Sequence, residues 1–281
     1  MPAITRTRRF SSVLLPFSLS VLSLSVPAAL EASGQTLSRE QQAEFLRTAQ
    51  IVSSARIGKG VTQPYRLTLS DGTLTHDAAF QAVDERRQMS RTGRGGAVEL
   101  NFTDSWRYNV AAPRLAELLG IGGMIPVSVE RSWRGNKGAI TWWVDDVLMD
   151  DEERRTTKAE PPDTNAWNQQ QSRMQVFTQL VHDTDRNQGN ILITKDWRLV
   201  MIDFTRAFRP WKRTPSPLTI LRRCDGKLLA AMRGLTKAAL QKELGDYLSG
   251  YELEALLARR DIIVKHFEGL IAQLGEASVL Y

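Results

Sequence analysis

The chain has 281 residues, of which 42% are hydrophobic and 24% charged, so it can bury a core without disulfides and is not disordered by composition. Its formal net charge is +6 at pH 7, and three of the basic residues lie within the first nine positions, so the rest of the chain has a charge of about +3 and no nucleic-acid partner is expected. The single cysteine, Cys224, cannot form an internal disulfide, and three scattered histidines do not make a zinc site. The composition therefore predicts a globular protein whose chemistry is carried by other residues.

The first thirty residues are typical of an export signal. Three arginines, at positions 6, 8 and 9, precede an apolar run from Val13 to Leu30, and Val26-Pro27-Ala28 is a plausible cleavage site. We therefore expect residues 1–28 to be a signal peptide, residues 29–40 to be flexible, and the protein to be periplasmic or secreted. Removal of the three arginines lowers the formal charge to about +3. A retained membrane anchor is the alternative, because the apolar run is close to the length that spans a bilayer.

Short strands and a glycine-containing loop are predicted in residues 41–150. The segment Arg56–Val61 is followed by Tyr65–Leu69 and then by the turn Asp71-Gly72, which predicts strands joined by a loop. Because glycines let backbone amides approach phosphates, Gly58, Lys59 and Gly60 in this loop are candidate nucleotide-binding residues. An ordinary hairpin loop is the alternative, since Gly-x-Gly alone is a weak motif.

Three further predicted elements complete this part of the chain. Ala78–Val83 is predicted to be a strand, and Ser105–Leu119 a helix that ends at Gly120. Pro126–Trp133 and Ala139–Val144 are rich in Val, Ile, Thr and Trp and predict another hairpin. A charge-dense stretch and Pro161-Pro162 follow, so we expect a boundary between two lobes near residue 150.

Residues 151–281 are predicted to contain a helix, a hairpin and a helical tail. Asp163-Thr164 can cap a helix that continues to Val181, because apolar residues recur three and four positions apart. Ile191–Ile193 and Leu199–Ile202 are predicted to be two buried strands joined by a polar turn. Apolar residues from Leu228 to Ile271 then recur at helical intervals and predict about three helices.

Asp185, Asn190 and Asp203 lie beside this predicted hairpin. Phosphoryl transfer needs one carboxylate beside the attacking hydroxyl and oxygen ligands that hold Mg²⁺ against the phosphates. Asn190 precedes the first strand and Asp203 follows the second, so the two should lie close together. We therefore predict that Asp185 is catalytic, with Asp183 as the next candidate, and that Asn190 and Asp203 are the metal ligands. A turn without chemistry is the alternative, because Asp, Asn and Gly are common in turns.

The string Asp-Arg-Asn-Gln-Gly-Asn-Ile-Leu from Asp185, followed by Ile-Asp-Phe around Asp203, resembles a known pair of motifs. It is similar to the catalytic loop and metal-binding segment of atypical protein-kinase-like enzymes, in particular the lipid-kinase-like, HipA-like and secretory FAM20-like branches. The resemblance implies an α+β fold with a β-rich N-lobe (41–150) and a mostly helical C-lobe (151–281). It also implies ATP with Mg²⁺ or Mn²⁺, and phosphate transfer to a hydroxyl of a protein, a lipid or a small molecule.

Two positions depart from the family pattern. Gln81 lies where the resembling families have a phosphate-binding lysine, so it offers a hydrogen bond but no charge. Asn109 lies near the position of the glutamate that pairs with that lysine, so the two amides would form a neutral pair. Lys59 is the nearest substitute cation, followed by Lys137 and Arg94. The alternatives to a phosphotransferase are therefore a weakened nucleotide-binding or scaffold protein on the kinase fold, and a nucleotidyl transferase on the same fold.

Overall fold

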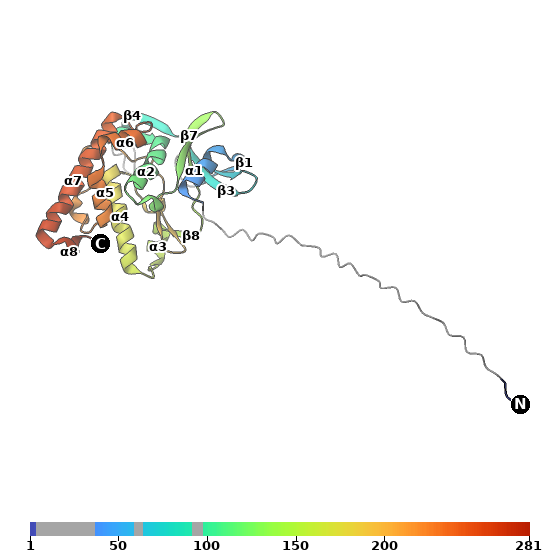
Figure 1. The fold of residues 1–281 in the computed structure, drawn as a ribbon. Helices are drawn as coiled ribbons and strands as arrows, with labels where there is room; N and C mark the ends of the chain where they lie inside the picture. Colours follow the sequence, from blue (N-terminus) through green and yellow to red (C-terminus); the bar gives the residue numbers. More distant parts are fainter. Residues whose placement is uncertain (4–36, 59–63, 92–97) are drawn as a thin grey trace. The chain divides into compact units, whose positions relative to one another are not determined.

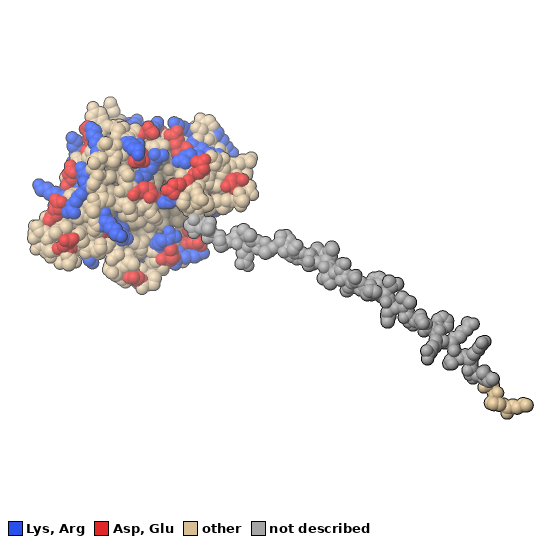
Figure 2. Space-filling model, in the orientation of Figure 1, with Lys and Arg blue, Asp and Glu red and all other residues tan. Residues whose placement is uncertain are grey.

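The computed structural model describes residues 1–3, 37–58, 64–91 and 98–281. The chain from Leu37 onward forms one compact unit (Figure 1). Most of the predicted signal peptide lies outside the described residues, as do Lys59, Gly60 and Arg94. Among the described residues, no helix combines the length and the apolar character needed to cross a bilayer. Basic and acidic side chains are interspersed over the face of this unit that Figure 2 shows.

Five antiparallel strands form the larger sheet, in the order β1-β2-β3-β7-β6. Their bounds are β1 (Gln50–Arg56), β2 (Tyr65–Ser70), β3 (Thr75–Gln81), β6 (Ser128–Trp133) and β7 (Asn136–Trp142). Side chains alternate along each strand, so that Leu67 and Leu69 of β2 are buried together with Phe80 of β3. The strand predicted at Tyr65–Leu69 and the second hairpin are confirmed, although β7 begins at Asn136 and not at Ala139. The strand predicted at Ala78–Val83 is present as β3, shifted to begin at Thr75 and end at Gln81. The strand before the glycine-containing loop lies earlier than predicted, because β1 ends at Arg56.

Helix α1 (Arg39–Thr48) packs against β6 and β7. It begins with a capping box, in which Ser38 and Gln41 each accept a hydrogen bond from the other's backbone amide. At its other end, Arg131 of β6 donates to the carbonyl oxygens of Leu46 and Ala49 at 2.8 Å each. Helix α1 begins at Arg39, which is two residues before the predicted start of the N-lobe at residue 41.

Along the chain, β3 is followed by a separate hairpin, β4 (Asp84–Arg91) and β5 (Val98–Ser105), and then by helix α2 (Trp106–Leu118). The sequence does not indicate this hairpin, because β4 is mostly charged and has no alternating apolar residues. The Ser105 hydroxyl accepts a hydrogen bond from the backbone amide of Arg107 and caps α2. As predicted, α2 ends just before Gly120, which has a φ of 71°.

Helices dominate the rest of the chain, with a three-stranded sheet in the order β10-β9-β8. The strands are β8 (Val147–Asp150), β9 (Ile191–Thr194) and β10 (Leu199–Met201), and the helices are α3 (Asp151–Thr157), α4 (Thr164–Val181), α5 (Gly226–Gly234), α6 (Lys237–Leu244), α7 (Gly250–Leu274) and α8 (Glu276–Val279). Short 3₁₀ turns occur at Gly122–Met124, Gln188–Asn190 and Leu218–Ile220. The predicted Asp163 cap of α4 and the β9–β10 hairpin are confirmed, and the tail contains three helices plus the single turn α8.

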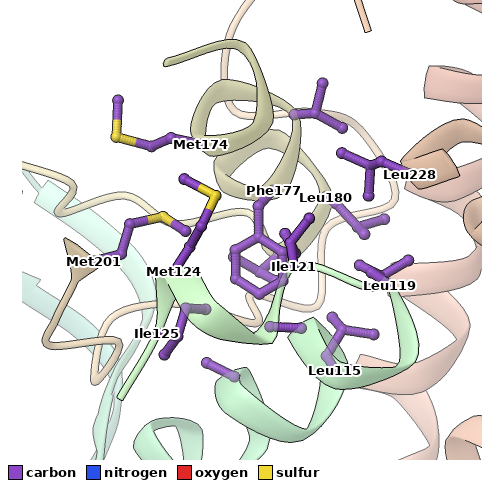
Figure 3. Packing of buried hydrophobic residues seen from close by; sticks show 14 of the residues in the cluster. Leu115, Leu119, Ile121, Met124, Ile125, Met174, Phe177, Leu180, Met201 and Leu228 are labelled. Carbon is purple, nitrogen blue, oxygen red and sulfur yellow. The ribbon is translucent and has the colours of Figure 1, made fainter. Parts of the chain in front are cut away.

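The core of the helical lobe includes residues from α2 as well as from α4 and the tail. Figure 3 shows Leu115 of α2 and Phe177 of α4 within one buried cluster, together with Ile121 and Met124 from the segment that follows α2. The other face of α2 contacts β6 and β7 of the larger sheet. Helix α2 therefore packs against both lobes, and the predicted α+β fold, with a β-rich lobe and a helical lobe, is confirmed.

Candidate active site

The β9–β10 hairpin brings Asn190 and Asp203 to one end of the small sheet. Met201 pairs with Ile191, and the Ile202 amide donates to the Asn190 carbonyl at 3.0 Å. Asn190 therefore lies opposite the residue that precedes Asp203, and the predicted proximity is confirmed. The Asn190 side chain also donates from Nδ2 to the carbonyl oxygen of Asp185 at 3.3 Å. The three predicted functional residues thus belong to one connected group.

A buried ion pair between Asp183 and Arg186, with an N···O distance of 2.6 Å, organises this group. Arg186 also donates to the carbonyl oxygens of Asn190 at 3.0 Å, of Ile202, and of Asp203 at 3.3 Å. The other carboxylate oxygen of Asp183 accepts a hydrogen bond from the Asp185 backbone amide at 3.0 Å. Asp183, the alternative candidate for the catalytic residue, therefore uses its carboxylate to hold the loop. The sequence signal for this pair is its i,i+3 spacing within Asp-Thr-Asp-Arg.

Asp185 is exposed to solvent. Partial desolvation of the Asp185 carboxyl raises its pKa; the negative charges of Asp183 and Asp203 act in the same direction, and the positive charge of Arg206 acts against it. The Asn187 side chain donates a hydrogen bond that partly opposes this rise. An accessible carboxylate with a raised pKa suits a group that accepts a proton from a bound hydroxyl.

Asp203 has a left-handed backbone, with a φ of 54°, that aspartate tolerates better than most residues. Its Oδ1 atom accepts hydrogen bonds from the Thr205 amide at 3.3 Å and from the Thr205 hydroxyl at 3.0 Å. Among the described residues, no hydrogen bond or ion pair engages its Oδ2 atom. One carboxylate oxygen therefore fixes the side chain while the other is available to a cation.

Asp104, at the end of β5, is a further acidic residue of this site that no sequence motif indicates. The Ser105 amide donates to the Thr205 carbonyl at 2.9 Å, which joins β5 to the Asp203 segment. Burial raises the pKa of the Asp104 carboxyl, and the negative charge of Asp203 adds to the rise. Its Oδ1 atom is buried and has no hydrogen-bond partner among the described residues. An unsatisfied carboxylate oxygen close to Asp203 fits a divalent cation.

Two amides link the larger sheet to this site. Asn109 of α2 donates from Nδ2 to Oε1 of Gln81 on β3, and its Oδ1 accepts the Phe204 amide at 2.6 Å. The predicted neutral pair is therefore present, and it extends to the residue after Asp203. Both side-chain groups of Asn109 are satisfied by this arrangement.

Comparisons with known proteins identify the fold. No family model and no curated protein matches the chain. It aligns with the structure of hydra Fam20 with sugar over 86% of this chain and 91% of that chain, with a TM-score of 0.61 and 14% identity. The Golgi casein kinase with Mn/ADP bound aligns over 86% of this chain and 78% of that chain, with a TM-score of 0.60 and 12% identity. The chain has an atypical protein-kinase-like fold. A Helicobacter pylori proinflammatory kinase, CtkA, also aligns, over 82% of this chain and 98% of that chain, with a TM-score of 0.51 and 9% identity.

Within this kinase-like fold, the predicted nucleotide loop is described only in part. Gly58 is exposed just after β1, and a Cβ atom added there would meet nothing within 4 Å, while Lys59 and Gly60 lie outside the described residues. Lys137, another predicted substitute for the missing lysine, forms an ion pair with Glu130 at 2.6 Å. Within the described part of the chain, no cation pairs with Gln81 in the place of a β3 lysine.

Replacing Asn109 by alanine is expected to lower the free energy of unfolding by about 2 to 4 kcal/mol, because it leaves one buried and one partly buried hydrogen-bonding group without a partner. The groups left without a partner are the Gln81 side chain and the Phe204 amide. Urea unfolding of the two proteins measures this difference. Asn168→Ala, on the exposed face of α4, is the control and should change the value by roughly 0.5 kcal/mol or less. A similar loss in both variants would contradict a special role for Asn109.

His182 ends α4 and connects the start of the loop at residues 183–190 to the segment after Asp203. Its backbone is left-handed, and its Nδ1 atom forms a hydrogen bond with the Arg213 carbonyl at 2.9 Å. Burial lowers the pKa of this histidine to about 4, with the charges of Arg259 and Arg209 acting in the same direction. His182 is therefore neutral in the folded protein, with Nδ1 as the donor.

Stability is expected to fall as the pH is lowered from about 6.5 to about 4, because His182 takes up a proton in the unfolded chain before it does so in the folded one. The pKa difference corresponds to roughly 3 kcal/mol. His182→Asn keeps an N–H donor, tolerates the left-handed backbone and cannot titrate. Urea unfolding at several pH values should show that this variant has lost most of the difference. An identical pH dependence in both proteins would rule out His182 as its source.

Proposed function

We propose that the chain is a metal-dependent phosphotransferase that moves the γ-phosphate of ATP to a hydroxyl group. The observation that carries the proposal is the convergence of Asp185, Asn190 and Asp203 at one end of the β9–β10 hairpin. The kinase-like fold supports it, as does the alignment with a Golgi casein kinase that has Mn/ADP bound. We infer nucleotide and divalent-cation binding from this combination.

In the proposed reaction, Asp185 accepts a hydrogen bond from the acceptor hydroxyl and then takes its proton. The hydroxyl oxygen forms a bond to the γ-phosphorus, the bond from that phosphorus to the β-phosphate oxygen breaks, and ADP leaves. Asp203 and Asn190 would hold Mg²⁺ or Mn²⁺, and the unsatisfied oxygen of Asp104 would add a second carboxylate. When bound, the cation neutralises charge that builds up on the phosphates. Within the described residues, no group of three or more His, Cys, Asp or Glu side chains is placed to hold a metal ion.

Gln81 favours a second candidate, a kinase-like protein that binds nucleotide but transfers phosphate weakly or not at all. The amide supplies no positive charge to the α- and β-phosphates, and its partner Asn109 is neutral as well. Removing both charges of an ion pair avoids a stranded buried charge, so the fold tolerates the change. A nucleotidyl transferase on this fold is a further alternative, because the same cation site can activate the α-phosphate.

Incubation of the purified protein with ATP and Mn²⁺ or Mg²⁺ tests these candidates. One sample carries the label on the γ-phosphate and the other on the α-phosphate. Label from the γ-position on the protein or an acceptor supports the phosphotransferase, and label from the α-position supports the nucleotidyl transferase. Metal-dependent thermal stabilisation by ADP without any transfer supports the nucleotide-binding alternative. If ADP has no effect on thermal unfolding with either metal, all three are wrong.

We also propose that the protein is exported after cleavage of residues 1–28. The motivating feature is the arginine-flanked apolar run at the N-terminus. Two of the aligned structures are described as a Golgi casein kinase, which is an enzyme of the secretory pathway. The mass of the protein recovered from the producing cells decides this point. Cleavage after Ala28 supports export, whereas an intact N-terminus in the membrane fraction supports the anchor.

A further inference from the structure

A hollow of about 650 Å³ opens beside Asp185. Its walls come from β5, from Thr184 in the loop before Asp185, and from the segment after Asp203. Neither member of the Gln81–Asn109 pair lines it, and Asn190 does not line it either. The hollow therefore lies beside Asp185 and apart from the Gln81–Asn109 pair and from Asn190.

Three arginines give the lining of this hollow an excess of positive charge. Arg206 and Arg209 both form ion pairs with the same carboxylate, Glu99. Arg209 is only 2% exposed, and the Nε atoms of these two arginines have no hydrogen-bond partner among the described residues. Arg213 is exposed and, in the part of the chain that the structure describes, has no carboxylate partner. The described lining opposes these cations with Glu99 and Asp185 alone, and the proposed function uses Asp185 for the hydroxyl.

A fourth arginine lies behind the same wall. Arg259 of α7 is fully buried and donates to the carbonyl oxygens of Leu180 at 2.7 Å and of Arg209 at 2.9 Å. It meets no carboxylate among the described residues, and burial lowers its pKa to about 9. Buried charges are unfavourable unless an opposite charge compensates them. The positive charge of this region is therefore left partly uncompensated by the described chain.

We propose that this hollow binds an oxyanion, either a phosphate or a carboxylate, that the acceptor carries beside its reacting hydroxyl. A guanidinium group can bind either a phosphate or a carboxylate through paired N–H donors. Of the arginines that line the hollow, Arg206 and Arg213 are the two that reach solvent. Val98 and Leu100 of β5 are each more than half exposed and, with Trp211, form an apolar wall. The acceptor therefore presents an apolar or ring face next to its charge. The inference that the bound molecule is a phosphate acceptor rests on the proposed function, whereas the inference that the hollow binds an anion does not.

Thermal unfolding of the full chain in increasing inorganic phosphate, at constant ionic strength, tests the anion site directly. Saturating ADP and Mg²⁺ keep phosphate away from the nucleotide side of the site. We expect phosphate to raise the unfolding midpoint and Arg213→Gln to weaken its apparent affinity about tenfold. Lys212→Gln removes an exposed neighbouring charge that does not line the hollow, and it should leave the affinity unchanged. The proposal is wrong if phosphate does not stabilise the protein, or if the two variants respond alike.

Matched acceptors then test what carries the anion. One pair is a sugar phosphate and its unphosphorylated sugar, and the other is a serine peptide with acidic or amidated neighbours. We expect the charged member of one pair to have the lower KM, and Arg213→Gln to raise that KM about tenfold with a smaller effect on kcat. Phosphate transfer without any preference for charge overturns the inference and leaves the proposed function intact. If ADP and metal do not bind, the proposed function fails, and the phosphate response of Arg213→Gln still decides the anion site.

Discussion

Replacing Asp203 by asparagine is expected to abolish the metal-dependent stabilisation of the protein by ADP. Asparagine tolerates the left-handed backbone at this position and keeps an oxygen that can accept the hydrogen bonds from Thr205. The substitution therefore removes the negative charge and leaves the local structure in place. A ligand at 100 times its Kd stabilises the folded state by about 2.7 kcal/mol, so its loss is easily measured by thermal unfolding with ADP and Mn²⁺.

The matched control for this measurement is Asp261→Asn. Asp261 is exposed on α7 and pairs with its neighbour Arg260, so its loss should leave the response to ADP and Mn²⁺ unchanged. Asp104→Asn should weaken the same response, since it removes the second carboxylate beside Asp203. A full response in the Asp203 variant would show that other groups hold the cation.

Replacing Asp185 by asparagine is expected to lower turnover by about two to four orders of magnitude. Asparagine cannot accept the proton of the hydroxyl, although it has nearly the same size and keeps a hydrogen-bonding oxygen. The backbone contacts of this residue, to the Asp183 carboxylate and to the Asn190 side chain, remain. ADP and Mn²⁺ should therefore stabilise this variant as they stabilise the unmodified protein, so kcat falls while nucleotide binding persists.

Asp196→Asn is the control for this second experiment, because Asp196 is exposed at the opposite end of the β9–β10 hairpin. It should retain turnover. Unchanged turnover in the Asp185 variant would show that the role assignment is wrong. Asp183→Asn is not a clean replacement test, because it breaks the buried ion pair with Arg186 and with it the anchoring of the loop.

The elements around the site are predictable because their signals are local. Asp163 caps α4 and the two apolar runs after Asn190 form β9 and β10, as their sequences indicate. The hairpin alone is enough to bring Asn190 close to Asp203. The pairing of the Gln81 and Asn109 side chains was predictable from the order of elements along the chain, together with the resemblance to kinase-like enzymes. Their hydrogen bond confirms that reasoning.

The missed features depend on contacts between distant segments. Asp104 precedes a helix cap and carries no motif of its own, and it joins the site only because β5 bonds to the segment at Thr205. The charged strand β4 lacks the alternation that marks a half-buried strand. Arg206 and Arg209 of the hollow pair with Glu99 from more than a hundred residues away, so neither spacing nor composition reveals these contacts.

The contact of Gln81 with Asn109, and of Asn109 with the Phe204 amide, joins the two lobes at the site without any formal charge. An ion pair between a lysine and a glutamate at this point would be weakened by salt if it were exposed. At low pH, protonation of the glutamate would remove the negative charge of the pair. Hydrogen bonds between neutral amides have neither dependence. The hydrogen bonds that join β3, α2 and the Phe204 amide should therefore persist across wide changes of salinity, and across the pH range in which the protein stays folded. Such tolerance would suit a protein that works where no cytoplasm buffers its surroundings.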